Sequence, residues 1–191
     1  MLANADWTFT WNAENRLAAA EKSNQKLEFT YDYMGRRVEK KVYTGSSGNW
    51  TLAKHQRFIY DGYKLIEELD GANSNAILRK YAWSGETILS VYDAGNTATY
   101  HYFTDANKNV GQLIDNSGNI VAAYEYSPFG QITSKTGTYA DINPFRFSSE
   151  YYDKETELVY YNYRYYSPIL GRWIKDDPIN LRLAPKVGEI E

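Results

Sequence analysis

The sequence predicts an all-β fold, an array of antiparallel β-hairpins that forms a curved strip or open spiral. The first observation is a short aromatic strand-and-turn unit that recurs along the chain. The second is a set of turn signals, rich in Asp, Asn and Gly, between short apolar runs. The third is composition, because the 191 residues include 19 tyrosines and 5 tryptophans, which favour strands and partly wet sheet faces.

The recurring unit is an aromatic residue, any residue, a second aromatic, then Asp or a related residue, with Gly and Arg following. Its clearest copy begins at Phe29 and ends with Gly35-Arg36. Successive second aromatics lie 19 to 29 residues apart, a spacing that strand, turn, strand, turn would produce. The aromatic pairs of the copies are Phe9/Trp11, Phe29/Tyr31, Phe58/Tyr60, Tyr81/Trp83, Tyr100/Tyr102, Tyr124/Tyr126 and Phe145/Phe147.

Residues 12–22 carry two conflicting signals. The segment is rich in Ala, Glu, Leu and Lys, which taken alone favour a helix. In register with the repeat, however, Asn12 to Arg16 occupies the place of the turn from Asp32 to Arg36. We give the repeat more weight and expect a turn followed by a strand.

Three loops are predicted from their turn residues. Asp115 to Asn119 joins apolar runs and predicts a hairpin with Gly118 in the left-handed conformation. Asp105 to Gly111 resembles a calcium loop, but a lysine lies inside it and the closing glutamate is absent, so we expect a hairpin turn held by Asx bonds. Gly45 to Asn49 predicts a longer, softer loop.

The most aromatic stretch runs from Asn143 to Ile179. Its alternation predicts one extended strand from Leu158 to Tyr166, with rings on both faces, which is typical of a strand between two surfaces. Ser167-Pro168 and Leu170-Gly171 should end that strand, and a short strand around Arg172 to Ile174 should follow.

Composition argues against several classes of function. The net charge of −3 offers no basic field for nucleic acid, and the lack of cysteine excludes disulfides and thiolate metal sites. His55 and His101 have no neighbours at metal-ligand spacing, so we expect no metal and no cofactor. No stretch has the ~18 apolar residues of a membrane helix, and the first residues do not resemble a signal peptide.

The motifs resemble those of the RHS (rearrangement hot spot), or YD-repeat, proteins, which are related to teneurins and to the C component of Tc toxins. The Tyr31-Asp32 unit with Gly35-Arg36 resembles a YD repeat, and Tyr124 to Gly130 resembles the family's Y-x-Y-D-P-F-G segment. Asn143 to Pro178 resembles the RHS repeat-associated core motif. This resemblance implies a β-strip that forms part of a hollow shell around a variable C-terminal toxin. It also divides the chain into repeat hairpins (1–142), core motif (143–179) and a divergent tail (180–191).

The resemblance also implies candidate catalytic residues. Family members cleave themselves after the core motif through two Asp-Pro motifs, and Asp177 matches the first, while Arg164 matches an arginine that supports the site. The second Asp-Pro motif is absent, and Asn180 replaces an expected glycine, so one half of an acid pair is missing. The alternatives are structural: Asp177 as a turn residue, and Arg164 stacked on rings or paired with Glu150 or Asp153.

We therefore expect a structural, non-enzymatic fragment of an RHS-type shell. One alternative is a carbohydrate-binding or adhesion module that uses its aromatic rows; a second is a degenerate self-cleaving core. The expected partners are the rest of the shell, a toxin cargo, or further copies bound through open sheet edges. The charged residues Arg36, Arg37, Glu39, Lys40 and Lys41 are expected to guard one edge. The protein should be bacterial, exported as part of a larger product.

Overall fold

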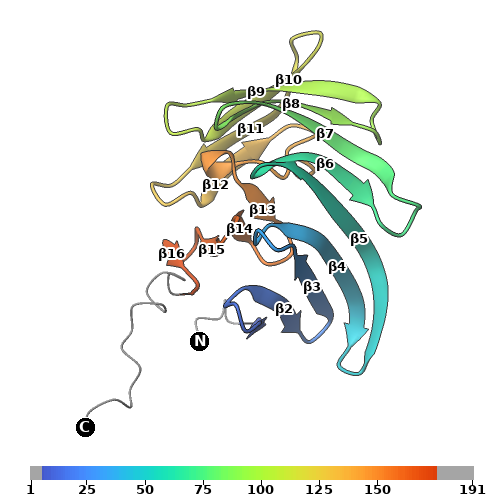
Figure 1. Ribbon diagram of the computed structural model, residues 1–191. Coiled ribbons are helices and arrows are strands. Elements are labelled where there is room, and N and C mark those ends of the chain that lie inside the picture. The colour runs from blue at the N-terminus through green and yellow to red at the C-terminus, as the bar shows by residue number, and fades with distance from the viewer. Residues whose placement is uncertain (1–5, 176–191) are drawn as a thin grey trace.

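A computed structural model describes residues 6–175, which form two antiparallel sheets. The larger sheet has twelve strands in chain order, so every neighbouring pair is joined by a hairpin. Figure 1 shows that this sheet curves, with β13 and β14 on the inner side of the curve. The larger sheet contains β1 (Thr8–Trp11), β2 (Leu17–Lys22), β3 (Gln25–Tyr31), β4 (Arg37–Ser46), β5 (Asn49–Asp61), β6 (Lys64–Asp70), β7 (Ala76–Ser84), β8 (Thr87–Asp93), β9 (Ala98–Thr104), β10 (Val110–Asp115), β11 (Ile120–Tyr126) and β12 (Ile132–Thr136).

The second sheet belongs to residues 137–175, which we call the core segment. It contains the 3₁₀ turn η1 (Phe147–Ser149), β13 (Tyr151–Asp153), β14 (Leu158–Tyr161), β15 (Arg164–Ser167) and β16 (Arg172–Trp173). The predicted all-β array of antiparallel hairpins in an open, curved strip is confirmed. Within residues 6–175 we find no helix with the length and apolar character that a membrane crossing needs.

One five-residue loop closes several of the hairpins, and the repeat encodes it. In the clearest copy, Asp32 Oδ1 accepts the backbone N–H groups of Met34 and Arg36, both at 3.0 Å, while Gly35 has φ +83°. The side chain thereby satisfies donors that the tight turn leaves unpaired. The same arrangement recurs with the acceptors Asn12, Asp105 and Asp115. The predicted turn at residue 12 and the Asx turn at residue 105 are therefore confirmed.

In four copies of the unit the second aromatic uses its polar tip. Tyr31 donates its hydroxyl to the Leu17 carbonyl at 2.8 Å, and Tyr60 donates to the Arg37 carbonyl at 2.9 Å. Trp83 and Tyr126 make the equivalent bonds to the carbonyls of Leu65 and Val110, each at 2.8 Å. Each ring thus fills the concave face of the sheet and also ties its strand to the backbone of a preceding one, which a phenylalanine could not do.

The core lies between the concave face of the larger sheet and the core segment. Rings from the two sides meet edge to face, as in Phe58–Tyr151 at 5.6 Å and Tyr81–Phe145 at 4.8 Å between centroids. The convex face keeps exposed apolar residues, among them Ile59 and Phe103. The strip therefore depends on the core segment to cover its inner face.

Three local expectations were wrong. Leu158 to Tyr166 is not one strand, because Asn162 adopts φ +50° and a two-residue turn folds β14 onto β15. Gly45 to Asn49 is not a long loop, since Ser46 pairs with Asn49 around a tight turn. The charged residues of β4 do not guard an edge, because β4 is an interior strand paired with β3 and β5. The hairpin at Asp115 and the short strand at Arg172 are confirmed.

Candidate functional site

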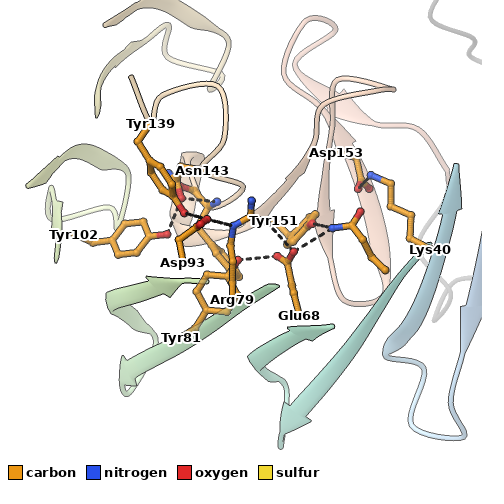
Figure 2. A network of polar contacts seen from close by, with 12 residues as sticks. Lys40, Glu68, Arg79, Tyr81, Asp93, Tyr102, Tyr139, Asn143, Tyr151 and Asp153 are labelled. Atoms are coloured by element: carbon orange, nitrogen blue, oxygen red, sulfur yellow. Dashed lines mark hydrogen bonds and ion pairs between the residues drawn. The ribbon is translucent and has the colours of Figure 1, made fainter. Parts of the chain in front are cut away.

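The chemistry of the described chain is concentrated in a line of buried polar groups between the larger sheet and the core segment, which we call the polar seam (Figure 2). At one end, Asp153 of β13 is fully buried between Arg37 and Lys40 of β4. Lys40 Nζ lies 2.7 Å from Asp153 Oδ1 and 2.6 Å from Glu155 Oε2, and Arg37 binds the other oxygen of Asp153. Simple alternation would put residues 37 and 40 on opposite faces, but the pairing of β4 with β3 shifts register between Glu39 and Arg37. This irregularity leaves Arg37, Lys40 and Val42 as the buried residues of β4.

Arg37 lies in a box of aromatic rings. Its guanidinium carbon is 4.5 Å from the Tyr160 ring centroid and 5.0 Å from that of Tyr151. Phe29, Phe58 and Tyr165 complete the box at 5.1 to 6.0 Å. Ring faces carry negative potential, so the box compensates for part of the hydration that Arg37 loses.

The charges at Asp153 are fixed. Burial alone would raise the pKa of the Asp153 carboxyl, but the neighbouring charges of Arg37 and Lys40 outweigh burial and hold the pKa below its usual value. The pKa of Lys40 is raised in turn, because Asp153 and Glu155 outweigh the opposite effect of burial. A carboxylate held ionised by two cations is unsuited to share a proton, so this group is an ion-pair anchor.

A second group of buried contacts lies at the middle of the seam. Glu68 of β6 accepts from Arg79 Nη1 at 2.9 Å, from the Tyr81 hydroxyl at 2.6 Å and from Gln56 Nε2 at 3.0 Å. Gln56 also lies 3.2 Å from the Tyr151 hydroxyl. Figure 2 shows Arg79 and Tyr81 beside Glu68, with Tyr151 of the core segment close by. Strands β5, β6 and β7 are thereby joined to β13.

The far end of the seam is built around Asp93 and Asn143. The Tyr139 hydroxyl donates to Asp93 Oδ2 at 2.8 Å, and Arg79 Nε lies 3.0 Å from the same oxygen. The Tyr102 hydroxyl donates to Asn143 Oδ1 at 2.6 Å. The seam therefore contacts strands from β4 to β9, and its arrangement is that of a buried fastening between two parts of one chain.

Of the two residues predicted for self-cleavage, the structure describes Arg164 and not Asp177. Arg164 lies in β15, and its guanidinium carbon is 4.0 Å from the Trp173 ring centroid, as the stacking alternative predicts. Asp153, one of the two carboxylates suggested as partners of Arg164 beside Glu150, pairs with Arg37 and Lys40. Asp177 lies outside the described residues, so cleavage stays a prediction, which a comparison of intact masses for the parent protein and Asp177→Asn would test.

Sequence reasoning missed most of the seam. Arg37 and Asp153 are 116 residues apart, and neither lies in a motif that points to the other. The available signal was the second arginine of Gly35-Arg36-Arg37, at a position where the buried face of the strand begins. Among residues 6–175 there is no group of three or more potential ligands that could hold a metal ion.

Comparison with known proteins gives consistent matches over nearly the whole chain. The model of the teneurin YD-shell family matches residues 1–184. The chain is 33% identical over 183 residues to the tRNA3(Ser)-specific nuclease WapA of Bacillus spizizenii, covering 92% of this chain and 7% of that protein. It is 28% identical over 201 residues to the double-stranded DNA deaminase toxin A of Burkholderia cenocepacia, covering 94% of this chain and 14% of that protein.

A solved structure has the same fold. The crystal structure of TcdB2-TccC3 without hypervariable C-terminal region matches with a TM-score of 0.69 and 22% identity, over 92% of this chain and 9% of that one. The chain therefore spans a small fraction of the length of each of these proteins.

Proposed function

Since this chain belongs to the teneurin YD-shell family, we propose that it is a structural, non-enzymatic segment of a β-shell whose parent encloses or delivers a C-terminal toxin. The observation that carries the proposal is the core segment, which covers the concave face of the strip and is fastened there by the buried Asp153 contacts with Arg37 and Lys40. The buried polar groups of the seam hold the strip and the core segment together, which supports a structural role for this part of the chain.

The related proteins support the toxin part of the proposal. WapA is named a nuclease, and the Burkholderia protein is named a deaminase toxin. TcdB2-TccC3 has a hypervariable C-terminal region, and the matching crystal structure was solved without it. A wall that is shared by proteins with different named activities fits a common container better than a common catalyst.

The sheet edges supply the proposed partner surface. Strand β1 pairs only with β2, and β12 pairs only with β11, so within the described chain each has one edge without a partner strand. We propose that further repeats of the shell pair there, because open edges offer rows of free backbone donors and acceptors. On this proposal the protein is bacterial and leaves the cell as part of the larger parent.

The test is the mass and the protease sensitivity of the native product. An antibody to Tyr151–Tyr166 should detect a product far larger than the 22.0 kDa of this chain in the source cells. Sequence downstream of the core motif should resist protease until the shell is opened by denaturant. A native product of 22.0 kDa would exclude a shell made from one copy and would favour adhesion or glycan binding by an assembly of copies.

A further inference from the structure

A cavity of about 250 Å³ lies beside the polar seam, between β4, β5 and β7 on one side and the core segment on the other. Its lining is unusual in charge, since five cationic side chains and two carboxylates face it. The cations are Lys40, Lys54, Arg79, Arg146 and Lys154, and the carboxylates are Asp141 and Glu155.

Two of the five cations are neutralised by neighbouring carboxylates. Lys40 pairs with Asp153 and Glu155, and Arg79 pairs with Glu68 and Asp93. Of the two lining carboxylates, Glu155 pairs with Lys40, and Asp141 pairs with Lys135 outside the cavity. Lys135 has the largest effect on the pKa of the Asp141 carboxyl, and the charges of Lys154 and Arg146 also lower it. Among the ion pairs of residues 6–175, none involves Arg146, Lys54 or Lys154.

Arg146 is the unusual member of this group, because its side chain is almost fully buried, at 4% exposure. Its Nε donates to the Asn143 carbonyl and its Nη2 to the Ala140 carbonyl, both at 3.0 Å. The Tyr152 ring lies 4.5 Å from the guanidinium carbon. Carbonyls and a ring orient the guanidinium but carry no negative charge, and the acidic group that interacts with it, Asp141, forms its ion pair with Lys135. A buried charge ordinarily has a closely paired partner of opposite sign.

Lys54 adds a second cation to the same space. Burial first, and then the positive charge of Lys40, lower the pKa of the Lys54 ammonium, and the acidic groups nearby only partly oppose this. Lys154 lies on the exposed turn between β13 and β14, beside the cavity. A bound anion would relieve the repulsion among these three cations.

We propose that this cavity binds a small oxyanion, with buried Arg146 at its base and Lys54 and Lys154 at its mouth. Phosphate and carboxylate oxygens share the chemistry that guanidinium and ammonium donors recognise. Because Lys54 belongs to β5 while Arg146 and Lys154 belong to the core segment, the bound anion also clamps the core segment to the sheet. The inference is independent of the toxin cargo and of the shell proposal.

The test measures the thermal stability of the 191-residue chain at constant ionic strength, with chloride replaced by inorganic phosphate or, separately, by acetate. Wild type should show a saturable rise in Tm at about 10 mM anion or less, where general salting-out effects are small. Lys54→Ala/Lys154→Ala, which removes both cations at the mouth of the cavity, should weaken the response roughly tenfold or more. Lys26→Ala/Lys80→Ala removes two lysines that do not line the cavity and should respond like wild type.

Comparison of the responses to phosphate and acetate shows which kind of oxyanion the cavity prefers. A stronger response to phosphate assigns a phosphate group, and a stronger response to acetate assigns a carboxylate. No saturable response of wild type to either anion, or an unchanged response of the cavity double variant, overturns the proposal. If that variant does not fold, the pKa of the Lys54 ammonium is measured by NMR in wild type, with and without the anion that gave the stronger response. The bound anion should raise this pKa, and an unchanged pKa overturns the proposed site.

Discussion

Asp153 is the residue that holds the sheet and the core segment together most directly. It is fully buried, and its two oxygens bind Arg37 and Lys40, whose side chains are 1% and 2% exposed. Removing its charge would leave two buried cations with the partial compensation of rings and of Glu155. The cost of such a change comes mainly from the uncompensated charges that remain.

We predict that Asp153→Asn lowers the free energy of unfolding by about 3–5 kcal/mol, measured by urea denaturation at pH 7. Asp141→Asn is the matched control, because its carboxylate is 57% exposed and pairs with a surface lysine, so a change below about 1 kcal/mol is expected. Equal effects of the two substitutions would contradict the role given to Asp153.

Glu150 gives the protein a contribution to stability that depends on pH. Burial raises the pKa of this carboxyl from near 4.5 to about 7, although Lys64 and Lys108 oppose the shift, and Glu86 adds to it. The folded state therefore holds a proton on Glu150 that the unfolded chain releases. The contribution of Glu150 to stability is largest at low pH and is lost as the pH rises from about 4.5 to 7.

We expect Glu150→Gln, which imitates the protonated acid, to abolish this fall and to stabilise the protein at pH 8. The gain should be roughly 1–2 kcal/mol, less than the full shift implies because the side chain keeps some contact with solvent. Urea denaturation at pH 5 and pH 8 measures it. Exposed Glu125→Gln should leave the pH dependence unchanged, and a Glu150→Gln protein that still loses stability above pH 5 would refute the assignment.

At the scale of the elements, several copies of the repeat specify a hairpin through local contacts. In the loops that begin at Asn12, Asp32 and Asp105, the first side chain caps the loop and the fourth residue takes positive φ. In several copies an aromatic tip also binds a preceding strand. Residue 15 is Asn and residue 108 is Lys, with φ of +61° and +64°, so the loop tolerates side chains at this position at some cost. Because all these contacts are local, the sequence predicted the strip well.

The contacts that sequence could not predict are distant. Arg37 and Lys40 looked like edge guards because charged residues on a strand usually face water, and nothing near them indicated a carboxylate more than a hundred residues away. The turn at Asn162 was missed for a different reason. The alternation of Tyr161, Tyr163 and Tyr165 continues through it, and the loop lacks the glycine that ordinarily marks such a turn.

Gly118 allows the cost of positive φ in the loop to be measured separately from side-chain clashes. It has φ +83°, and a Cβ added there would meet no atom within 4 Å, so only backbone strain opposes a side chain. Gly118→Ala should destabilise the protein by about 1 kcal/mol. Gly111→Ala is the control, since Gly111 lies in β10 without positive φ and its added Cβ would be at an ordinary 3.8 Å from the nearest atom. Thermal unfolding of both variants gives the comparison, and equal losses would show that φ is not the cause.

At the scale of the whole molecule, the larger sheet and the core segment are two halves of one core. Rings such as Phe29, Phe58 and Tyr81 reach their partners only in residues 145–165. The convex face is already exposed, so a strip without the core segment would have apolar surface on both faces. Such a strip also has two open edges and should associate rather than fold as a monomer.

This dependence predicts the behaviour of the chain when it is divided. Residues 1–136 expressed alone should aggregate or bind a hydrophobic dye, because the concave face has no cover. Co-expression with residues 137–191 should restore a soluble 1:1 complex, measured by size-exclusion chromatography with light scattering. The 137–191 fragment that carries Asp153→Asn should restore less of the soluble complex, since the buried Arg37 and Lys40 would lack their acidic partner. A monomeric, cooperatively unfolding 1–136 fragment would instead mean that the strip is a complete unit and that the core segment is a separable attachment.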